Sequence, residues 1–429
     1  MREYFPISSE SGVRYYCRAF PVVFSRALGA EIFDTDGARY IDFLSGSGAL
    51  NYGHNHPRLK EAIVDYLGCN GILQSLDLHT QAKAAFITRF NETILRPRNM
   101  EYKLQFTGPT GTNAVEAALK LARKVTQRSR VVAFTGAFHG VTMGSLALTS
   151  SRGHRAAAGT PLNGTIRMPF EGFLGSTDEL TYIERMLMAP GAGEEPPAAF
   201  VVETVQGEGL ACASGAWLRE IERIARSMGS LLVVDDIFAG CGRTGPFFSF
   251  EQFGIEPDIV CLSKSIGGIG LPMALLLIKP DRDVWEPGEH NGTFRGNNLA
   301  FVAAAAALEF WQDASFHAGV QALIRTLDSE LTGMVQEFGE YGLRAVGRGA
   351  LRGLDVEEPA AAASVQAAAF RRGLIFERCG ATDSVLKLLP PLNIPLDLLR
   401  EAMGVLTYAL RSTFNAAPIR EKVYETVHS

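Results

Sequence analysis

The central part of the chain, from about residue 104 to 280, alternates short apolar runs with amphipathic stretches of helical period. The runs lack the regular polar alternation of a strand that faces solvent on one side. This pattern is typical of strands that crossover helices cover on both faces. The runs occupy residues 131–135, 199–203, 231–235, 259–263 and 274–278. We therefore predict an α/β domain built on a mainly parallel sheet.

The segments on either side of this region follow other patterns. Residues 32–43 contain two β-type runs around an Asp-Gly turn, which predicts a hairpin, and the pattern becomes helical after Pro57. From about residue 298 the chain has the pattern of a long Ala-rich helix, then of helices with short strands, among them 385–389. We expect residues 1–55 to be an amino-terminal part of a small domain, 56–297 the large domain, and 298–429 the carboxy-terminal small domain.

Composition and charge narrow the class of protein. The 429 residues are 47% hydrophobic and 20% charged, as in a soluble globular protein with a sizeable core. The net charge of −5, without a block of like charges, argues against nucleic acid or an anionic membrane as partner. The apolar runs are too short to span a bilayer, and residues 1–6 lack the apolar segment of a secretion signal. We expect a cytoplasmic protein.

The cysteines and histidines do not indicate a metal centre. The six cysteines are scattered and none forms a Cys-x-x-Cys pair, so neither a disulfide framework nor a zinc site is expected. His54-Asn55-His56 resembles a pair of metal ligands, but a polar loop before Pro57 is the better interpretation. We therefore predict no metal site.

One candidate for chemistry is a Gly-rich turn at residues 107–116 that leads into a predicted helix. Asn113 and Glu116 have the spacing of a capping box. Free backbone N–H groups at such a helix start favour a phosphate group. The absence of a Gly-Lys-Ser/Thr sequence excludes a nucleotide P-loop. A plain helix cap and an anion site both remain open at this point.

Two further candidates lie at the carboxyl ends of predicted buried strands, where ligands gather in open α/β sheets. Asp235 ends the run 231–235, and a buried carboxylate there must be paired. It is either a structural cap or ion pair, or the partner of a buried cation such as a protonated pyridine nitrogen; Asp236 is the more ambiguous neighbour. Lys264 follows the run 259–263, and desolvation would lower its pKa and make its amine nucleophilic.

Taken together, these segments resemble the class III aminotransferases of fold type I over roughly residues 10–415. The family signature Asp-Glu-x-Gln-x-Gly-x-Gly-Arg-Thr-Gly is matched by residues 235–245, and the lysine motif by Ser263-Lys264. The resemblance implies the cofactor pyridoxal 5'-phosphate (PLP) and the PLP-dependent transferase fold type I. In that fold, a large domain with a mainly parallel seven-stranded sheet is joined to a smaller α/β domain. More closely, the chain is similar to the diaminobutyrate–2-oxoglutarate aminotransferases, best known from ectoine biosynthesis, in residues 48–57, 108–124, 240–245 and 288–298.

The resemblance also implies roles for individual residues. Lys264 would carry PLP as a Schiff base and act as base and acid for the proton shift, while Asp235 would pair with the pyridinium nitrogen. Thr293 would reach the phosphate across a subunit interface, so that a homodimer or a dimer of dimers shares its active sites. Glu208 matches a glutamate that pairs with a gating arginine in relatives that act on terminal amines. The remaining cofactor contacts are expected from Gly111, Thr112, Phe138, His139 and Phe238.

Three positions depart from the pattern of the wider family. Phe238 stands where glutamine usually hydrogen-bonds the phenolic oxygen of PLP, and a phenyl ring cannot form that bond. Lys387 replaces the gating arginine of 4-aminobutyrate enzymes, as in the diaminobutyrate enzymes, and a point charge lacks the bidentate fork. Val141 stands where those enzymes have a second arginine. A 4-aminobutyrate substrate is therefore disfavoured.

The resemblance predicts that a small-molecule donor and acceptor react in turn by a ping-pong scheme. L-Glutamate would give its amino group to PLP, and L-aspartate 4-semialdehyde would take it to become L-2,4-diaminobutyrate. One alternative is that the substrate is another terminal amine, such as ornithine, a polyamine or a natural-product diamine. The presence of Phe238 in place of glutamine motivates this alternative. The other is a non-catalytic protein of the same fold, which the presence of Lys264 and Asp235 disfavours.

Overall fold

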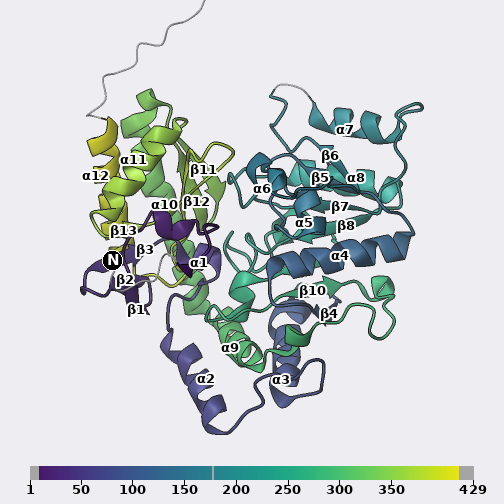
Figure 1. Cartoon of the computed structure of the whole chain (residues 1–429), viewed down its shortest axis with the longest axis horizontal. Helices are drawn as coiled ribbons and strands as arrows, with labels where there is room; N and C mark the ends of the chain where they lie inside the picture. Colours follow the sequence, from purple (N-terminus) through teal and green to yellow (C-terminus); the bar gives the residue numbers. More distant parts are fainter. Residues whose placement is uncertain (1–8, 176–177, 415–429) are drawn as a thin grey trace, which may run out of the picture.

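The computed structural model describes residues 9–175 and 178–414, and its largest feature is a seven-stranded sheet (Figure 1). The strand order is β4-β10-β9-β8-β7-β5-β6. β9, β8, β7, β5 and β6 are parallel, whereas β10 runs antiparallel to both of its neighbours. The strands are β4 Lys103–Phe106, β5 Val131–Phe134, β6 Thr165–Met168, β7 Ala199–Val202, β8 Leu231–Asp235, β9 Ile259–Leu262 and β10 Leu275–Ile278. The predicted mainly parallel sheet is confirmed.

Helices cover both faces of this sheet, which is why its strands are apolar throughout. Alternate side chains of one strand, such as Val233 and Val234 of β8, point to opposite faces. One face packs against α4 (Gly111–Thr126), and the other packs against α8 (Gly215–Ser227) and α3 (Gln81–Phe90). Between residues 57 and 308 the chain also forms the helices α2 Pro57–Gly68, α5 Met143–Leu148, α6 Arg152–Ala156, α7 Glu179–Met188 and α9 Asn298–Leu308.

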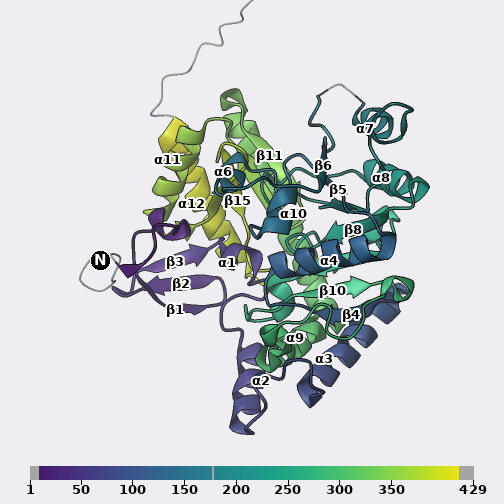
Figure 2. The same cartoon turned by 45° about the vertical axis from the view of Figure 1, so that its right-hand side comes forward.

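The beginning and the end of the described chain fold together beside the large sheet (Figures 1 and 2). The predicted hairpin is present as β2 (Glu31–Asp34) and β3 (Arg39–Asp42), and β3 pairs in parallel with β13 (Leu374–Ile375). A third sheet has the order β11-β12-β15-β14. The remaining elements are β1 Phe24–Leu28, α1 Ser45–Gly48, α10 Ala314–Phe338, β11 Arg344–Arg348, β12 Leu351–Asp355, α11 Pro359–Phe370, β14 Glu377–Cys379, β15 Val385–Leu388 and α12 Leu396–Phe414.

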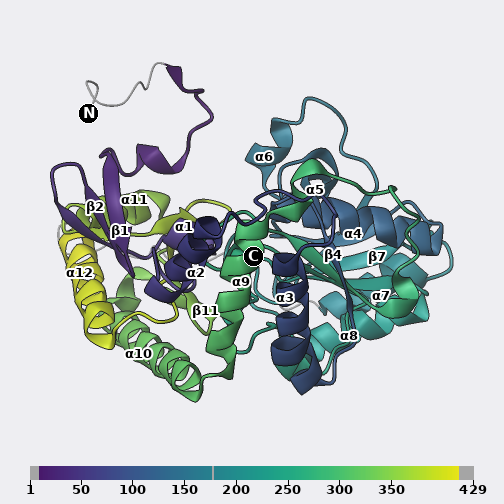
Figure 3. The ribbon, with the colours of Figure 1, turned by 90° about the horizontal axis from the view of Figure 1, so that it is seen from below.

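Seen from below, α10 and α12 lie on one side of the molecule and α4, α7 and α8 on the other (Figure 3). The long Ala-rich helix expected from residue 298 is wrong in its length. α9 ends at Leu308, and α10 begins after Asp313, whose side chain accepts a hydrogen bond from the N–H of Ser315. This cap starts α10, after a short 3-10 helix, Glu309–Gln312, has followed the end of α9.

Two strands of the sheet, β4 and β6, were not predicted. Both are edge strands with partly exposed residues, so they lack the apolar run that revealed the central strands.

Residues 1–6, which we expected not to be a secretion signal, lie outside the described residues. Within the described part of the chain, no helix is both long and apolar enough to cross a membrane.

Candidate active site

Three neighbouring parallel strands end in ionisable side chains at one edge of the large sheet. Glu203 follows β7, Asp235 ends β8, and Lys264 comes two residues after β9. Because these strands are parallel and adjacent, their carboxyl ends lie at the same edge. This is the edge at which open α/β sheets bind ligands.

Asp235 is buried, with 5% of its surface exposed, and is held from two directions. Its Oδ2 lies 2.7 Å from Nδ1 of His139, and its Oδ1 accepts the N–H of Ile237 at 3.2 Å. Burial acts to lower the pKa of His139, but the hydrogen bond and charge of Asp235 outweigh it and raise that pKa above its ordinary value. The carboxylate is thus fixed in a position from which it can stabilise a cation.

Lys264 has an unusual backbone and an unusual amine. Its φ is +54°, in the left-handed region that non-glycine residues rarely adopt, and its side chain is half-buried. Burial of the amine, followed by the charge of Lys387, lowers the pKa of Lys264 to about 7. A large fraction of the amine is therefore uncharged at neutral pH, which is the form that attacks an aldehyde.

This lowered pKa predicts when the cofactor-free protein takes up an aldehyde. Because the uncharged amine reacts, the rate of PLP attachment should rise as the pH increases through about 7 and level off above it. The measurement is the growth of PLP absorbance after mixing. The same pH series with a blocked lysine derivative corrects for the ionisation of PLP itself. A rate that keeps rising to the pH at which free lysine titrates would contradict the prediction.

The ring of Phe238 lies close to two amines. Its ring centre is 3.5 Å from Nζ of Lys264 and 4.8 Å from Nζ of Lys387. The ring also packs against Gly48 and Gly207, since a Cβ at these positions would lie 3.6 Å and 3.4 Å from it, at about van der Waals distance. Phe238 therefore packs against both amines through the face of its ring.

The start of α4 lies beside this group of residues. Gly111 packs so closely on Ile237 that a Cβ would come within 3.0 Å of its side chain. The hydroxyl of Thr112 lies 2.5 Å from that of Thr142 and 2.7 Å from that of Ser145. Gly140, with φ +125°, allows this approach because a Cβ there would lie 2.6 Å from Oγ1 of Thr112. Backbone N–H groups and hydroxyls thus gather where an anion can bind.

The capping box expected from Asn113 and Glu116 is wrong. Thr110 is the residue before the helix, and its hydroxyl donates to Oδ1 of Asn113 inside the first turn. The carboxylate of Glu116 instead accepts hydrogen bonds from the Thr142 hydroxyl and the Ser145 N–H. Glu116 therefore fastens the start of α5 to α4, because tertiary contacts offered it better donors than its own helix end.

Glu203 is a site residue that the sequence analysis did not single out. It is 5% exposed, and its carboxylate accepts the N–H of Gly207 at 2.8 Å and of Phe138 at 3.2 Å. Burial raises the pKa of Glu203 to about 7. The sequence could have indicated Glu203, because it is an acidic residue at the end of an apolar run, as Asp235 is. It holds the loop of Phe138 and His139 against the loop that carries Glu208.

Lys387 pairs with a different acid from the one expected. Within the described residues its Nζ donates to the carbonyl of Gly207 at 3.0 Å and lies 3.3 Å from Oε2 of Glu377. Glu208 acts on Lys387 only through its charge. Burial raises the pKa of Glu208, and the charge of Lys387 opposes that rise. The direct partner of Lys387, Glu377, belongs to the adjacent strand and was not predicted.

Thr293 lies apart from the other predicted site residues. It is exposed at the start of a short 3-10 helix, Thr293–Gly296, and its carbonyl accepts a hydrogen bond from the side chain of Gln74. Ser75 N–H donates to the carbonyl of Gly296, so the two segments lie side by side. In the single chain, Thr293 therefore belongs to a surface rather than to the cluster around Lys264.

Asp236 has a structural position. Its carboxylate accepts the N–H and the hydroxyl of Ser249, and burial raises its pKa to about 7. The described residues contain no group of three or more His, Cys, Asp or Glu side chains that could hold a metal ion. The two adjacent aspartates thus differ: Asp235 faces the site, and Asp236 fastens a loop behind it.

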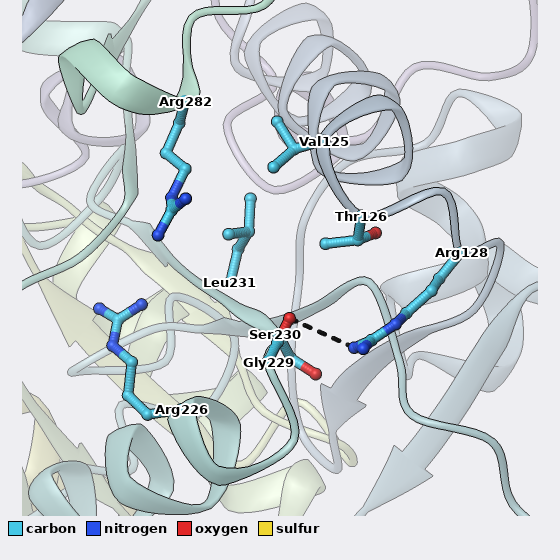
Figure 4. A pocket seen from close by; sticks show the side chains of 8 residues that line it. All are labelled: Val125, Thr126, Arg128, Arg226, Gly229, Ser230, Leu231 and Arg282. Carbon is cyan, nitrogen blue, oxygen red and sulfur yellow. Dashed lines mark hydrogen bonds between the residues drawn. The ribbon is translucent and has the colours of Figure 1, made fainter.

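A separate cavity of about 290 Å³ lies at the other end of β8, where Leu231 begins the strand (Figure 4). Three arginines line it. Arg226 and Arg282 both contact the buried carboxylate of Asp258, and Arg128 donates to backbone carbonyls such as that of Met228. Because these charges already have partners, the cavity is a structural feature and not part of the site at Lys264.

The fold and the site together define a class of protein. The chain matches the family described as aminotransferase class III over residues 15–410, and it belongs to that family. The ornithine aminotransferase of Toxoplasma gondii has a similar structure, with a TM-score of 0.82 at 25% identity, covering 97% of this chain and 94% of that one. The predicted family and the predicted fold type I are confirmed.

Curated relatives are more similar in sequence. A diaminobutyrate–2-oxoglutarate transaminase of Oceanobacillus iheyensis is 50% identical over 404 residues, covering 94% of this chain and 95% of the relative. The protein of the same name from Wolinella succinogenes is 51% identical over 403 residues, covering 94% of each chain. The subgroup named from the sequence motifs is therefore confirmed as the one that this chain resembles.

The site fits the cofactor of this family, PLP. The half-buried amine of Lys264 suits an aldehyde, and the buried Asp235 suits a protonated ring nitrogen. The start of α4, with Gly111 and the hydroxyl of Thr112, suits a phosphate. The aldehyde, the ring nitrogen and the phosphate of PLP thus each have a suitable partner in this site. The chain is a PLP-dependent transaminase.

Proposed function

We propose that the protein transfers the amino group of L-glutamate to L-aspartate 4-semialdehyde, which gives 2-oxoglutarate and L-2,4-diaminobutyrate, and that it also catalyses the reverse. The observation that carries the proposal is the name diaminobutyrate–2-oxoglutarate transaminase of relatives about 50% identical over 94% of the chain. In each half of the reaction an amine on one carbon is exchanged for a carbonyl oxygen, so no outside oxidant or reductant is required. The two substrates use one site in turn.

Each residue of the site has a proposed part in this reaction. When bound, PLP supplies an electron sink for the C–H bond that breaks beside the reacting amine. Lys264 holds the cofactor and then moves the proton between the two carbons through its amine. Asp235, positioned by His139, keeps the ring nitrogen protonated. Phe138 covers one face of the ring.

The phosphate end and the substrate end are assigned in the same way. Gly111 and Thr112 bind the phosphate at the start of α4. Phe238, in place of the usual glutamine, holds Lys264 by packing, since its ring lies 3.5 Å from the amine. Lys387 binds a substrate carboxylate, and Glu208 adds negative charge at the same end. The absence of a second arginine at Val141 fits a substrate other than 4-aminobutyrate.

We further propose that two chains share their sites, as a homodimer or a dimer of dimers. The surface around Thr293 supports this proposal because it carries several exposed apolar side chains. Phe294 is 65% exposed, and the neighbouring segment of residues 72–78 carries further exposed apolar side chains. Exposed side chains of this size are costly in water, and a second copy would cover them. Thr293 would then contact the phosphate in the partner's site.

Mixing two inactive variants tests the shared site. Lys264→Ala removes the amine, and Thr293→Ala removes the hydroxyl proposed to act in the partner. After the two proteins are unfolded and refolded together, up to about a quarter of the sites should contain both groups and regain activity. The measurement is the activity of the mixture compared with each variant alone. No gain above the separate activities, in a mixture shown to exchange subunits, would contradict the prediction.

The division of the chain and its location are also proposals. Residues 56–297 form the large domain, and residues 1–55 with 298–429 form the small one; the pairing of β3 with β13 supports this grouping. The six cysteines are all unpaired, which fits a reducing compartment. We therefore propose that the protein acts in the cytoplasm.

The substrate proposal is tested by the two half-reactions. Holoenzyme is treated with L-2,4-diaminobutyrate, and the absorbance band of bound PLP should disappear. It should return on addition of 2-oxoglutarate, with one L-glutamate formed per site. L-Ornithine and 4-aminobutyrate serve as comparison donors. If ornithine bleaches the band and diaminobutyrate does not, the substrate is another terminal amine and the proposal is wrong.

A further inference from the structure

Glu377 and Lys387 form a buried pair of opposite charges across two neighbouring strands. They are direct partners in the register of β14 and β15, and Oε2 of Glu377 lies 3.3 Å from Nζ of Lys387. Glu377 is 9% exposed and Lys387 is 3% exposed. Burial acts to lower the pKa of Lys387, but Cys379, Glu377 and Glu208 raise it above its ordinary value. Lys387 is therefore charged when the protein works.

Hydroxyl groups from the amino-terminal segment complete the surroundings of Glu377. The Tyr16 hydroxyl donates to Oε1 at 3.3 Å, and the Ser47 hydroxyl donates to Oε2 at 3.4 Å. Burial and the charge of Glu377 raise the pKa of Tyr16. The carboxylate thus has three neighbours that can each donate, but the contacts are long for a charged acceptor. An ammonium group brought to Glu377 could form a shorter bond.

Glu377 is also among the residues that line a cavity of about 420 Å³. The other lining residues include Tyr15, Tyr16, Arg378 and Asp383. Burial, then Asp383, raises the pKa of Tyr15 to about 12, with Glu377 and Glu208 adding to the rise. The cavity therefore has both acidic and basic groups on its walls, as a site for a zwitterion requires.

The pair of Glu377 and Lys387 is also close to the amine of Lys264. Lys387 and Lys264 both contact the ring of Phe238, at 4.8 Å and 3.5 Å from its centre. The charge of Glu377 acts on Lys264 as well, in the direction that raises its pKa. Glu377 and Lys387 therefore lie close enough to Lys264 for their charges to act on its amine.

We propose that Glu377 is the specificity residue for the α-ammonium group of the donor, while Lys387 binds the α-carboxylate beside it. This inference rests on the proposed function and deepens it. In L-2,4-diaminobutyrate the reacting amine is four bonds from the α-ammonium, about 5 Å in an extended chain. L-Glutamate places only a carboxylate at that end, so Lys387 serves both substrates and Glu377 serves the diamine alone.

The test compares two donors that differ only in the α-amino group, L-2,4-diaminobutyrate and 4-aminobutyrate. In Glu377→Gln, the ratio of their kcat/KM values should fall at least tenfold, because a hydrogen bond between two charged groups is lost for one donor only. Asp383→Asn is the matched control. It removes the same charge from the rim of the same cavity, and its ratio should change less than threefold.

Equilibrium binding provides a readout that does not depend on turnover. In Lys264→Ala protein, calorimetry should show that adding Glu377→Gln weakens diaminobutyrate binding at least tenfold, with little change for 4-aminobutyrate. Glu377→Asp keeps the charge and should restore part of the preference. If Glu377→Gln folds poorly, Glu377→Asp and Tyr16→Phe provide the comparison, with a smaller loss of preference in each.

A loss that is equal for both donors would show that Glu377 only positions Lys387 and would overturn the inference. Failure of the proposed function is a separate outcome, since wild-type protein would then ignore diaminobutyrate. In that case L-ornithine and 5-aminovalerate, which also differ only in the α-amino group, decide the role of Glu377. An unchanged ratio for that pair in Glu377→Gln would likewise overturn it.

Discussion

Lys264→Ala is expected to lower kcat for transamination by about 10⁴-fold or more, because one amine is proposed both to hold the cofactor and to move the proton. The structure gives Lys264 the properties that this part requires. It lies at the carboxyl edge of the sheet, and burial with the charge of Lys387 lowers its pKa to about 7. The measurement is single-turnover amino transfer, followed by the absorbance of PLP.

Lys279→Ala is the matched control for this variant. Lys279 also follows a buried strand directly, but β10 is antiparallel to β9, so Lys279 lies at the opposite end of the sheet. Its Nζ contacts only the exposed Glu256 among acidic groups of the described chain, at 3.4 Å. Activity should stay within about twofold of wild type. A Lys264→Ala protein that retained a tenth of the wild-type rate would contradict the proposed role.

Asp235→Asn is expected to lower kcat by about 10³-fold, with a much smaller effect on stability. The amide keeps the shape of the side chain but loses the charge that is proposed to stabilise the protonated ring nitrogen. It also removes the buried partner of His139, which lies 2.7 Å from Oδ2. The measurements are kcat and the absorbance of the bound cofactor, which reports the protonation of the ring system.

Asp236→Asn is the control, because the neighbouring carboxylate is equally buried but contacts Ser249 instead of the site. The new amide would keep one acceptor oxygen but would place an NH₂ group next to a donor of Ser249. We expect a loss of about 1–3 kcal/mol in the free energy of unfolding and a change in kcat of less than tenfold. Equal losses of kcat in both variants would mean that Asp235 acts only through the fold.

The central strands could be predicted from the sequence because burial on both faces leaves a continuous apolar run. All five predicted runs correspond to strands, and β8 has the predicted bounds. The edge strands could not be predicted in this way, since an edge strand such as β4 retains Lys103 and Gln105 among its residues. The direction of β10 was also hidden, because a buried strand has the same composition in either orientation.

The candidate site shows a similar division. Lys264, Asp235 and the start of α4 follow sequence patterns whose physical meaning is local, namely a polar group placed at the end of an apolar run or a glycine-rich turn. Glu377 gave no such signal, because it becomes a partner of Lys387 only through the pairing of β14 with β15. Glu208, which the family resemblance favoured for that pairing, acts on Lys387 through its charge alone.

By itself, the sequence determined the class of fold, the family and the residues at the ends of the central strands, because these depend on burial and on motifs that are contiguous in the chain. Tertiary structure alone decided that β10 is antiparallel to β9, which places Lys279 at the opposite end of the sheet from Lys264. It also decided that Tyr16, Glu377 and Lys387 come together beside one cavity. These results depend on strand direction and on contacts between distant segments. The pattern of neighbouring residues in a sequence contains no information about either.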